Sequence, residues 1–475
     1  MDEVHRIPGS AAPRAPGMPL PAGPAGMDGH AAVRWATIEA LLRHGGWFAF
    51  FLVLAPILGP RDVGLFVLAM GGIAMVETLF GEVAAQPLIR LGRLEATHLS
   101  TAFLTITGVG ATISLLLYAI AGAIAAMFEE SALGDMFQSL ALLPMLSAMT
   151  ALPCALLRRN GRPAPCAIAS GCGQAFGGAV AIMLAVAGAG PWSLVAQMSV
   201  QRFVEIALLW GIAGRGIGIG WSRRAFAELI GAFDLAALAP LLRVLSREAP
   251  RLLVGVALGP VAAGLYLVAG RVAEACHDIL LAPLALASGG TGGIVRAVRR
   301  IALPAVLGST ALAAIALPAL LDMRWWGAVR PLQFLLLGVL AAALLPARAA
   351  ARSAATLVLS GLAVAALTVP YGLTALAAAL LLHGLGAIAV VLAGAPRPRA
   401  GAAGRAIAGL WAPLVAAIAT GVLLSNVAGW VGTALAPGMA LMVLSGCGAA
   451  AYRALLSLFE SGRTRPPAGE RRTAA

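Results

Sequence analysis

The chain of 475 residues is 60% hydrophobic and only 11% charged, and its mean hydropathy is +0.92. A soluble domain carries about 25% charged residues, so this composition excludes a soluble globular protein and indicates a polytopic membrane protein. The net charge of +13 comes from arginine alone, because the sequence contains no lysine. The long apolar runs do not alternate with polar residues, which excludes a transmembrane β-barrel.

The two ends of the chain differ in composition from everything between them. Residues 1–33 are rich in Pro, Gly and Ala and are predicted to form a disordered cytoplasmic tail, and residues 458–475 a basic cytoplasmic tail. Between the tails, about fourteen apolar segments are long enough to cross a bilayer as helices, so the predicted fold is an all-α integral membrane protein. The segments lie near residues 36–58, 63–86, 101–127, 136–157, 166–188, 191–213, 227–257, 260–287, 301–321, 329–347, 353–369, 372–395, 406–427 and 430–455.

Arginines are distributed unequally between the alternate loops of this predicted topology. Because arginines accumulate in loops on the cytoplasmic side, the bias predicts an even number of helices with both termini in the cytoplasm. Sixteen lie in one set of loops: Arg90, Arg93, Arg158, Arg159, Arg162, Arg215, Arg223, Arg224, Arg296, Arg299, Arg300, Arg348, Arg352, Arg397, Arg399 and Arg405. The other set holds only Arg61, Arg324 and Arg330.

A short motif occurs twice in the chain, 200 residues apart. Leu58-Gly59-Pro60, followed after three residues by Gly64-Leu65-Phe66, recurs as Leu258-Gly259-Pro260 and Gly264-Leu265-Tyr266. The offset covers six predicted helices, so both copies have the same orientation, as in parallel repeats related by an axis along the membrane normal. We predict two six-helix lobes, 34–224 and 225–400, around a central cavity. Two extra helices would follow in 401–457.

The segment 227–257 carries three arginines at spacings of four residues: Arg243, Arg247 and Arg251. On an α-helix this spacing places all three on one face. An arginine inside the membrane costs roughly 2.5–3.5 kcal/mol on insertion scales, so three need water, partners or a ligand. The guanidinium group stays charged and is suited to phosphate. The stripe predicts a cationic wall of a hydrated cavity for an anionic substrate. The alternative is that neighbouring acids neutralise it and that it serves packing only.

Three acidic residues within the predicted spans are candidates for ion coupling. Glu77 has no charged neighbour within a helical turn, so its carboxyl group is either protonated or paired across the helix bundle. Glu274 and Asp278 lie one turn apart and could share a proton. Glu274 could instead form a plain intrahelical ion pair with Arg271, three residues earlier. Both interpretations of this second cluster remain open.

Two more arginines within predicted spans have an acidic residue close by in the sequence. Arg43 follows Glu39 by four residues and Arg202 precedes Glu205 by three, so each is most simply a self-neutralising pair that faces the bundle interior. The complete set of predicted substrate-binding arginines in the cationic lumen is Arg243, Arg247, Arg251, Arg271, Arg202 and Arg43.

The sequence lacks the motifs that an enzyme of this size would need. It contains no Gly-x-x-x-x-Gly-Lys phosphate loop, no Gly-x-Ser-x-Gly elbow and no His-Glu-x-x-His pair, so we predict a protein that is not an enzyme and has neither catalytic residues nor a metal site. We predict no cofactor, and we expect a gradient of H⁺ or Na⁺ to supply the energy for the protein's function. The five cysteines are scattered in apolar segments and are predicted to be small buried thiols.

Several short words of the sequence resemble the polysaccharide transporter branch of the multidrug/oligosaccharidyl-lipid/polysaccharide exporter superfamily. No single word is specific, but together they follow the right order and spacing over about residues 35–290. They are the first copy of the repeated motif, Ala84-Ala85-Gln86-Pro87-Leu88-Ile89-Arg90, Leu157-Arg158-Arg159, Gly190-Pro191-Trp192-Ser193, Trp221-Ser222-Arg223-Arg224, Leu253-Val254-Gly255, the second copy, Ala269 and Arg271.

This resemblance implies a flippase of the bacterial inner membrane. Such proteins move undecaprenyl-pyrophosphate-linked oligosaccharides between leaflets by alternating access, for O-antigen or exopolysaccharide synthesis, with coupling to an ion gradient. The implied partners are the lipid-linked oligosaccharide, membrane lipids and other polysaccharide-assembly proteins, with no nucleic acid. The resemblance carries over no fixed set of binding residues.

Three other functions are weighed against this one. A multidrug and toxin extruder of the same superfamily usually binds organic cations, so acids rather than three arginines should dominate its lumen. A lipid II exporter agrees in charge, but the short words fit the polysaccharide branch better. A membrane polymerase or ligase of the polysaccharide pathway usually carries a large outer loop, which this sequence lacks.

Overall fold

The structure is a computed structural model that describes residues 46–84, 86–91, 94–128, 130–160, 164–213, 220–233, 239–277, 319–344 and 347–393, with a few single residues between them. Every regular element in these ranges is a helix, which confirms the predicted all-α class. The predicted tails, the last two predicted helices, Arg43 and Asp278 lie outside the described residues. The number of fourteen helices therefore stays a prediction.

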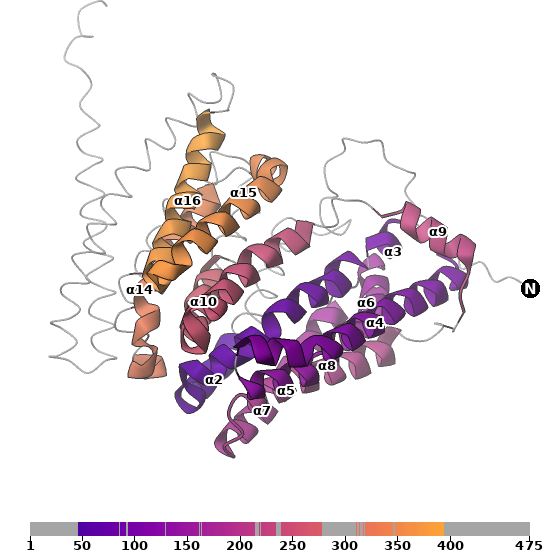
Figure 1. Ribbon diagram of the computed structural model, residues 1–475. Coiled ribbons are helices and arrows are strands. Elements are labelled where there is room, and N and C mark those ends of the chain that lie inside the picture. The colour runs from indigo at the N-terminus through magenta and orange to yellow at the C-terminus, as the bar shows by residue number, and fades with distance from the viewer. Residues whose placement is uncertain are drawn as a thin grey trace, which may run out of the picture. The chain divides into compact units, whose positions relative to one another are not determined.

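The chain divides into two compact units, residues 1–264 and 265–475 (Figure 1). The predicted lobes, 34–224 and 225–400, are a different division and stay a prediction. The first unit contains α2 (Gly46–Thr78), η2 (Leu79–Val83), α3 (Gln86–Arg90), α4 (Ala96–Phe128), α5 (Ser131–Leu140), α6 (Leu143–Arg159), α7 (Ala164–Val186), α8 (Trp192–Ala213), α9 (Arg223–Gly231) and most of α10 (Ala239–Cys276). The second contains the end of α10, η6 (Met323–Ala328), α14 (Val329–Leu344), α15 (Ala347–Thr368), η7 (Val369–Tyr371) and α16 (Leu373–Ala393).

Five helical stretches among the described residues are long and apolar enough to cross a membrane. Such a crossing takes about 20 apolar residues. The protein is therefore a multi-pass membrane protein, as its composition predicted. The stretches are Ala49–Thr78, Ala96–Ala126, Ser131–Arg159, Ala164–Val186 and Pro240–Cys276.

The predicted span 227–257 is wrong at its start. Residues Arg223–Gly231 form the separate amphipathic helix α9, and α10 begins only at Ala239. The side chain of Ala225 is buried, whereas those of Arg224 and Glu228 are exposed. The charged side chains of Arg224 and Glu228, one turn apart, make this stretch too polar to belong to the membrane span, so it forms a separate helix.

The repeated motif adopts the same backbone conformation in both copies. α2 is kinked at Gly59, where φ is 78° and ψ is 169°, and α10 is kinked at Gly259, where φ is 84° and ψ is 176°. A residue with a Cβ atom is strained at such positive φ values, which accounts for glycine at both positions. In each copy one helical stretch ends at the kink and the next begins there. The two spans predicted on either side of each motif are therefore joined in one kinked helix, α2 or α10.

The two copies of the motif also pack against each other in a reciprocal contact. A Cβ atom on Gly64 would lie 1.7 Å from the carbonyl oxygen of Pro260, and one on Gly264 would lie 2.1 Å from that of Pro60. The glycine of each copy therefore meets the proline of the other copy, which is the pattern of a two-fold contact. All four residues belong to the first unit. The repeat seen in the sequence is thus a structural one, and its glycines let the two backbones touch.

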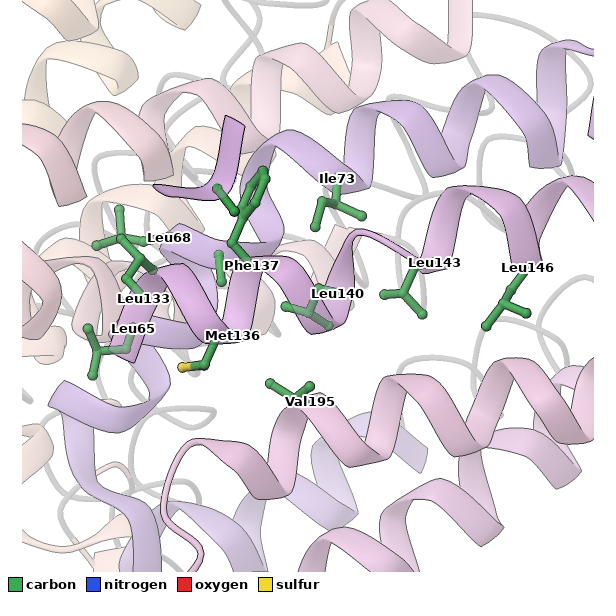
Figure 2. Packing of buried hydrophobic residues seen from close by; sticks show 12 residues of the cluster. Leu65, Leu68, Ile73, Leu133, Met136, Phe137, Leu140, Leu143, Leu146 and Val195 are labelled. Carbon is green, nitrogen blue, oxygen red and sulfur yellow. The ribbon is translucent and has the colours of Figure 1, made fainter. Parts of the chain in front are cut away.

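The core of the first unit forms where α5 and α6 pack beside α2 and α8. Leu133, Met136 and Phe137 of α5 are buried in one cluster with residues from the other three helices, as Figure 2 shows. The remaining members of this cluster that the figure labels are Leu65, Leu68, Ile73, Leu140, Leu143, Leu146 and Val195. The cluster anchors the C-terminal half of α2, which carries Glu77.

Glycines bring α7 and α8 into close contact. A Cβ atom on Gly173 would lie 2.7 Å from the carbonyl oxygen of Gln201, and one on Gly177 would lie 2.6 Å from that of Gln197. Small residues permit such close backbone approach between membrane helices. The position of α8 relative to its neighbours is therefore set by two residues without side chains.

Two cysteines predicted to be separate thiols are paired. Cys154 of α6 and Cys166 of α7 form a disulfide, with their Cα atoms 5.8 Å apart. Their spacing of twelve positions does not indicate this pair, because the turn that joins the two helices lies between them. Cys172 and Cys276 are not bonded to another cysteine, as predicted.

In the second unit, α14 and α15 both pack against α16. The turn before η6 is held by Asp322, whose φ of 99° is unusual for a residue with a Cβ atom. Its carboxylate accepts hydrogen bonds from the backbone N–H of Met323 and, at 3.0 Å, from Nε of Arg324. These bonds compensate the local strain, and Trp325, which is completely buried, fixes η6 below the turn.

Candidate functional site

Two carboxylates and one guanidinium group of α2 and α8 meet beside α6 in the first unit. Arg202 of α8 donates from Nε to Oε1 of Glu77 on α2 at 2.9 Å, and from Nη1 to Oε2 of Glu205 at 2.7 Å. Ser147 of α6 donates its hydroxyl to the same Glu77 oxygen at 2.8 Å. Gln201 donates its amide to Oε1 of Glu205 at 3.0 Å. We call these five residues the Glu77–Arg202 network.

The local sequence explains how these side chains reach one another. Glu77 lies in the last turn of α2, where the α-helix passes into the π-helix Leu79–Val83. Single π-turns inside helices occur frequently at functional sites. On α8, Arg202 and Glu205 are three residues apart and so share a face. Gly173 of α7 leaves the space for Glu205, since a Cβ atom there would lie 3.0 Å from the Cγ atom of Glu205.

The network is buried and carries an excess of negative charge. The side chains of Glu77, Arg202 and Glu205 are 11%, 23% and 5% exposed. With both carboxylates ionised, one negative charge is not balanced by Arg202. An unbalanced charge in a low-dielectric site is costly, so binding a proton or a small cation would relieve it. The geometry therefore suits an exchangeable cation better than an anionic substrate.

The network bears on two predictions. Glu77 is paired across the helix bundle, which was one of the two states predicted for it. Arg202 pairs with Glu205, as the spacing predicted, and also with Glu77, and its place in a cationic lumen stays a prediction. Sequence reasoning missed Ser147 and Gln201. A hydroxyl or amide in an apolar helix gives no sign of its partner until the helices are packed.

The three arginines at the start of α10 have three different environments. Arg251 is 1% exposed and donates from Nη1 to Oε1 of Glu248 at 2.6 Å. This burial and pairing favour the packing interpretation for Arg251, and its role in a cationic wall stays a prediction. Arg247 is half-buried, and its buried Nε has no hydrogen-bond partner among the described residues. Arg243 is exposed.

The remaining predicted charges lie at the end of α10. Nη1 of Arg271 is 3.6 Å from Oε2 of Glu274, so these residues form the intrahelical ion pair that was one of the two alternatives. The other alternative, a proton shared between Glu274 and Asp278, needs a residue outside the described ranges and stays a prediction. The same holds for the predicted place of Arg43 in the lumen.

α9 is fixed to the adjacent end of α4 by a second polar cluster. The backbone N–H of Glu95 donates to Nδ1 of His98 at 3.2 Å, so Nε2 carries the ring proton and donates to Glu228 at 2.8 Å. Arg224 donates from Nε to the other carboxylate oxygen of Glu228 at 2.9 Å. These two donors, His98 first, lower the pKa of Glu228 from its ordinary value of 4.5.

The lowered pKa predicts a pH-dependent contribution of Glu228 to stability. A carboxylate with a depressed folded-state pKa stabilises the protein above its unfolded-state pKa, and this contribution is lost as the pH falls through the folded-state pKa. We expect Glu228→Gln to lower Tm relative to wild type at neutral pH, and this difference to shrink as the pH is lowered below the ordinary carboxyl pKa of 4.5. Thermal unfolding at several pH values measures it. A Tm difference that stays constant over this acidification would contradict the prediction.

A comparison with known protein families supports the resemblance seen in the sequence. A family model described as "Polysaccharide biosynthesis protein" matches residues 53–288, from α2 to beyond the end of α10. This part of the chain is similar to that family. The matched region contains both copies of the repeated motif and the Glu77–Arg202 network. The family resemblance predicted from the sequence is thus confirmed. No curated protein sequence matches the chain.

Several solved transporter structures share the fold of this chain. "Lipid II flippase MurJ, inward closed conformation" has a TM-score of 0.65 and 11% identity, over 91% of this chain and 100% of that one. An inward-facing multidrug resistance MATE transporter has a TM-score of 0.55 and 17% identity, over 77% and 96%. A MOP superfamily transporter from Pyrococcus furiosus, described as having a binding pocket of reverse polarity, has a TM-score of 0.50 and 16% identity, over 81% and 99%. These similarities show that the chain has the all-α fold of these membrane transporters.

Proposed function

We propose that the protein is a flippase that moves an undecaprenyl-pyrophosphate-linked oligosaccharide across the bacterial inner membrane. The product would serve exopolysaccharide or O-antigen synthesis, and transport would proceed by alternating access. The match to a polysaccharide biosynthesis family over residues 53–288 carries this proposal. The arginine bias of the loops places both termini in the cytoplasm. Other polysaccharide-assembly proteins are the expected partners.

Arg243 and Arg247 are the residues we assign to the anionic part of the substrate. The buried Nε of Arg247 has no hydrogen-bond partner among the described residues, which is costly, and a phosphate oxygen would satisfy it. Arginine presents a planar set of donors that matches phosphate geometry. Arg243 lies one turn before Arg247 on the same helix face, so the two could contact one pyrophosphate group.

The Glu77–Arg202 network is the site we assign to the coupling ion, H⁺ or Na⁺. Its charge excess of one is the observation that supports this assignment, because a single proton or sodium ion would bring the network to neutrality. Glu274, paired with Arg271, lacks such an excess in the described residues. We therefore place coupling in the first unit, at Glu77 and Glu205.

Complementation tests the flippase assignment. The chain would be expressed in a bacterium that lacks its own O-antigen flippase, and surface polysaccharide would be measured at equal membrane levels of each variant. Wild type is expected to restore the polysaccharide, and Arg243→Gln/Arg247→Gln to lower it at least about tenfold, since each lost charged contact to phosphate costs about 1.5–3 kcal/mol. The matched control, Arg158→Gln/Arg162→Gln, removes two exposed arginines, one in the last turn of α6 and one just after it, and should behave as wild type.

Arg251 should respond in a different way from its two neighbours. Arg251→Gln leaves the buried carboxylate of Glu248 without its partner, which costs about 3–5 kcal/mol, so we expect a fall in the membrane level of the protein itself.

Full activity of the Arg243/Arg247 double variant in the complementation test would reduce the stripe to a structural feature. If wild type fails to complement, deletion in the native organism decides, and unchanged surface polysaccharide there would refute the proposed substrate class.

A further inference from the structure

A surface groove runs along α4 beside α9. It has a volume of about 380 Å³, and its walls include Leu104, Thr105, Gly108, Ile113 and the side chain of Trp221. From Leu104 to Ile113 the helix rises about 14 Å at 1.5 Å per residue. Half of the hydrocarbon core of a bilayer is about 15 Å thick. The groove therefore has the length of one leaflet.

The groove lies on a part of the protein that faces the bilayer. Only 17% of the most apolar stretch of α4 is buried within the protein. Val109, in the groove, is 46% exposed, and Leu115 and Leu116, just beyond it, are 69% and 60% exposed. Because α4 spans the membrane, a groove on its exposed side is filled by lipid rather than water.

One end of the groove is lined by an aromatic ring, and an arginine follows it closely in the sequence. Trp221 is 60% exposed, as expected for a residue at the level of the lipid headgroups. Two residues later, Arg223 starts α9 with an exposed side chain that makes no hydrogen bond or ion pair with the described residues. The arginine bias predicts that this end faces the cytoplasm, where anionic lipids attract basic residues.

The position of this end is fixed relative to α4. The backbone N–H of Ser222 donates to Oγ1 of Thr101 at 3.0 Å, and Leu229 is buried against α3, α4 and α6. Together with the bond between His98 and Glu228, these contacts hold α9 at the end of α4, where Figure 1 shows it. Trp221 and Arg223 are therefore in place before any ligand binds, which lowers the entropic cost of binding.

We propose that the groove is a binding site for an anionic glycerophospholipid of the cytoplasmic leaflet. One acyl chain lies along α4 from Leu104 to Ile113, and the phosphate group sits beside Arg223. A long polyprenyl chain fits the groove less well, because the groove ends after one leaflet. The site is separate from the arginines of α10 and does not depend on the transported substrate.

Native mass spectrometry of the full-length protein in detergent tests this site. Phosphatidylglycerol, phosphatidylethanolamine and undecaprenyl phosphate would be titrated separately. Gly108→Leu should fill the groove without strain, since a Cβ atom there meets nothing within 4 Å. Gly122→Leu is the matched control, because it lies on the same helix, is equally open and is outside the groove. Thermal unfolding would show that both variants are folded.

We expect wild type to bind phosphatidylglycerol more tightly than the zwitterionic lipid. Gly108→Leu should weaken phosphatidylglycerol binding about tenfold, equivalent to the loss of roughly two buried methylene groups, and Gly122→Leu should not. Arg223→Gln should weaken phosphatidylglycerol binding about fivefold and phosphatidylethanolamine binding less, because the ammonium group of the latter already balances its phosphate charge. Unchanged binding in Gly108→Leu would overturn the site, and an unchanged lipid preference in Arg223→Gln would overturn the headgroup assignment. Tighter binding of undecaprenyl phosphate, lost in Gly108→Leu, would assign the groove to the carrier lipid instead.

Discussion

Gly64→Ala is expected to lower the thermal stability of the purified protein by several degrees, and Gly264→Ala to do the same. The added methyl group would lie 1.7 Å from the carbonyl oxygen of Pro260 in the first variant and 2.1 Å from that of Pro60 in the second. Neither carbonyl can move without shifting its helix. Overpacking of this kind costs typically 1–3 kcal/mol or more, and here the two copies of the motif must separate.

Gly72→Ala is the matched control, eight residues after Gly64 in α2. An added Cβ atom at Gly72 meets nothing within 4 Å, so this substitution should be neutral or slightly stabilising. Thermal unfolding in detergent, followed by intrinsic fluorescence, compares the three variants. Because Gly64 and Gly264 contribute to one reciprocal contact, the double variant should lose less than the sum of the two single effects. Equal Tm values for Gly64→Ala and Gly72→Ala would show that the contact does not contribute to stability.

Arg202→Gln is expected to have the largest effect of any single charge substitution in the described part of the chain. It leaves the carboxylates of Glu77 and Glu205 facing each other without a cation. Removing one partner from a buried ion pair costs about 3–5 kcal/mol, and here two carboxylates lose their common partner. We expect little folded protein in the membrane, or a Tm far below that of wild type.

Glu77→Gln should have the opposite profile. It removes the excess charge, leaves Arg202 paired with Glu205 and keeps an acceptor for the hydroxyl of Ser147. Its Tm should equal or exceed that of wild type, while transport into proteoliposomes should no longer respond to an imposed H⁺ or Na⁺ gradient. A stable Glu77→Gln protein that still follows the gradient would falsify the coupling role. A destabilisation as large as that of Arg202→Gln would show that Glu77 is structural.

Several features of the protein could be determined from the sequence because they depend on local properties. Composition and the length of the apolar runs established a multi-pass helical membrane protein. The recurrence of Gly59-Pro60 and Gly64 as Gly259-Pro260 and Gly264 established the repeat, and the ordered short words indicated the family resemblance. Each of these signals is read along the chain, since a span needs only its own apolar residues and a positive φ needs only its own glycine.

Only the tertiary structure decided which charges meet. Glu77 and Arg202 are 125 residues apart, and their ion pair depends on the packing of α2, α6 and α8. The spacing of four placed Arg243, Arg247 and Arg251 on one face but could not give the depth of each side chain, which separates the buried Arg251 from the exposed Arg243. The second half of α9 was included in the predicted span 227–257. The separate position of this amphipathic helix depends on hydrogen bonds from His98 to Glu228 and from Ser222 to Thr101, which the sequence does not show. The energy of a charge in a membrane depends on its neighbours across helices, and the sequence does not specify those neighbours until the helices are packed.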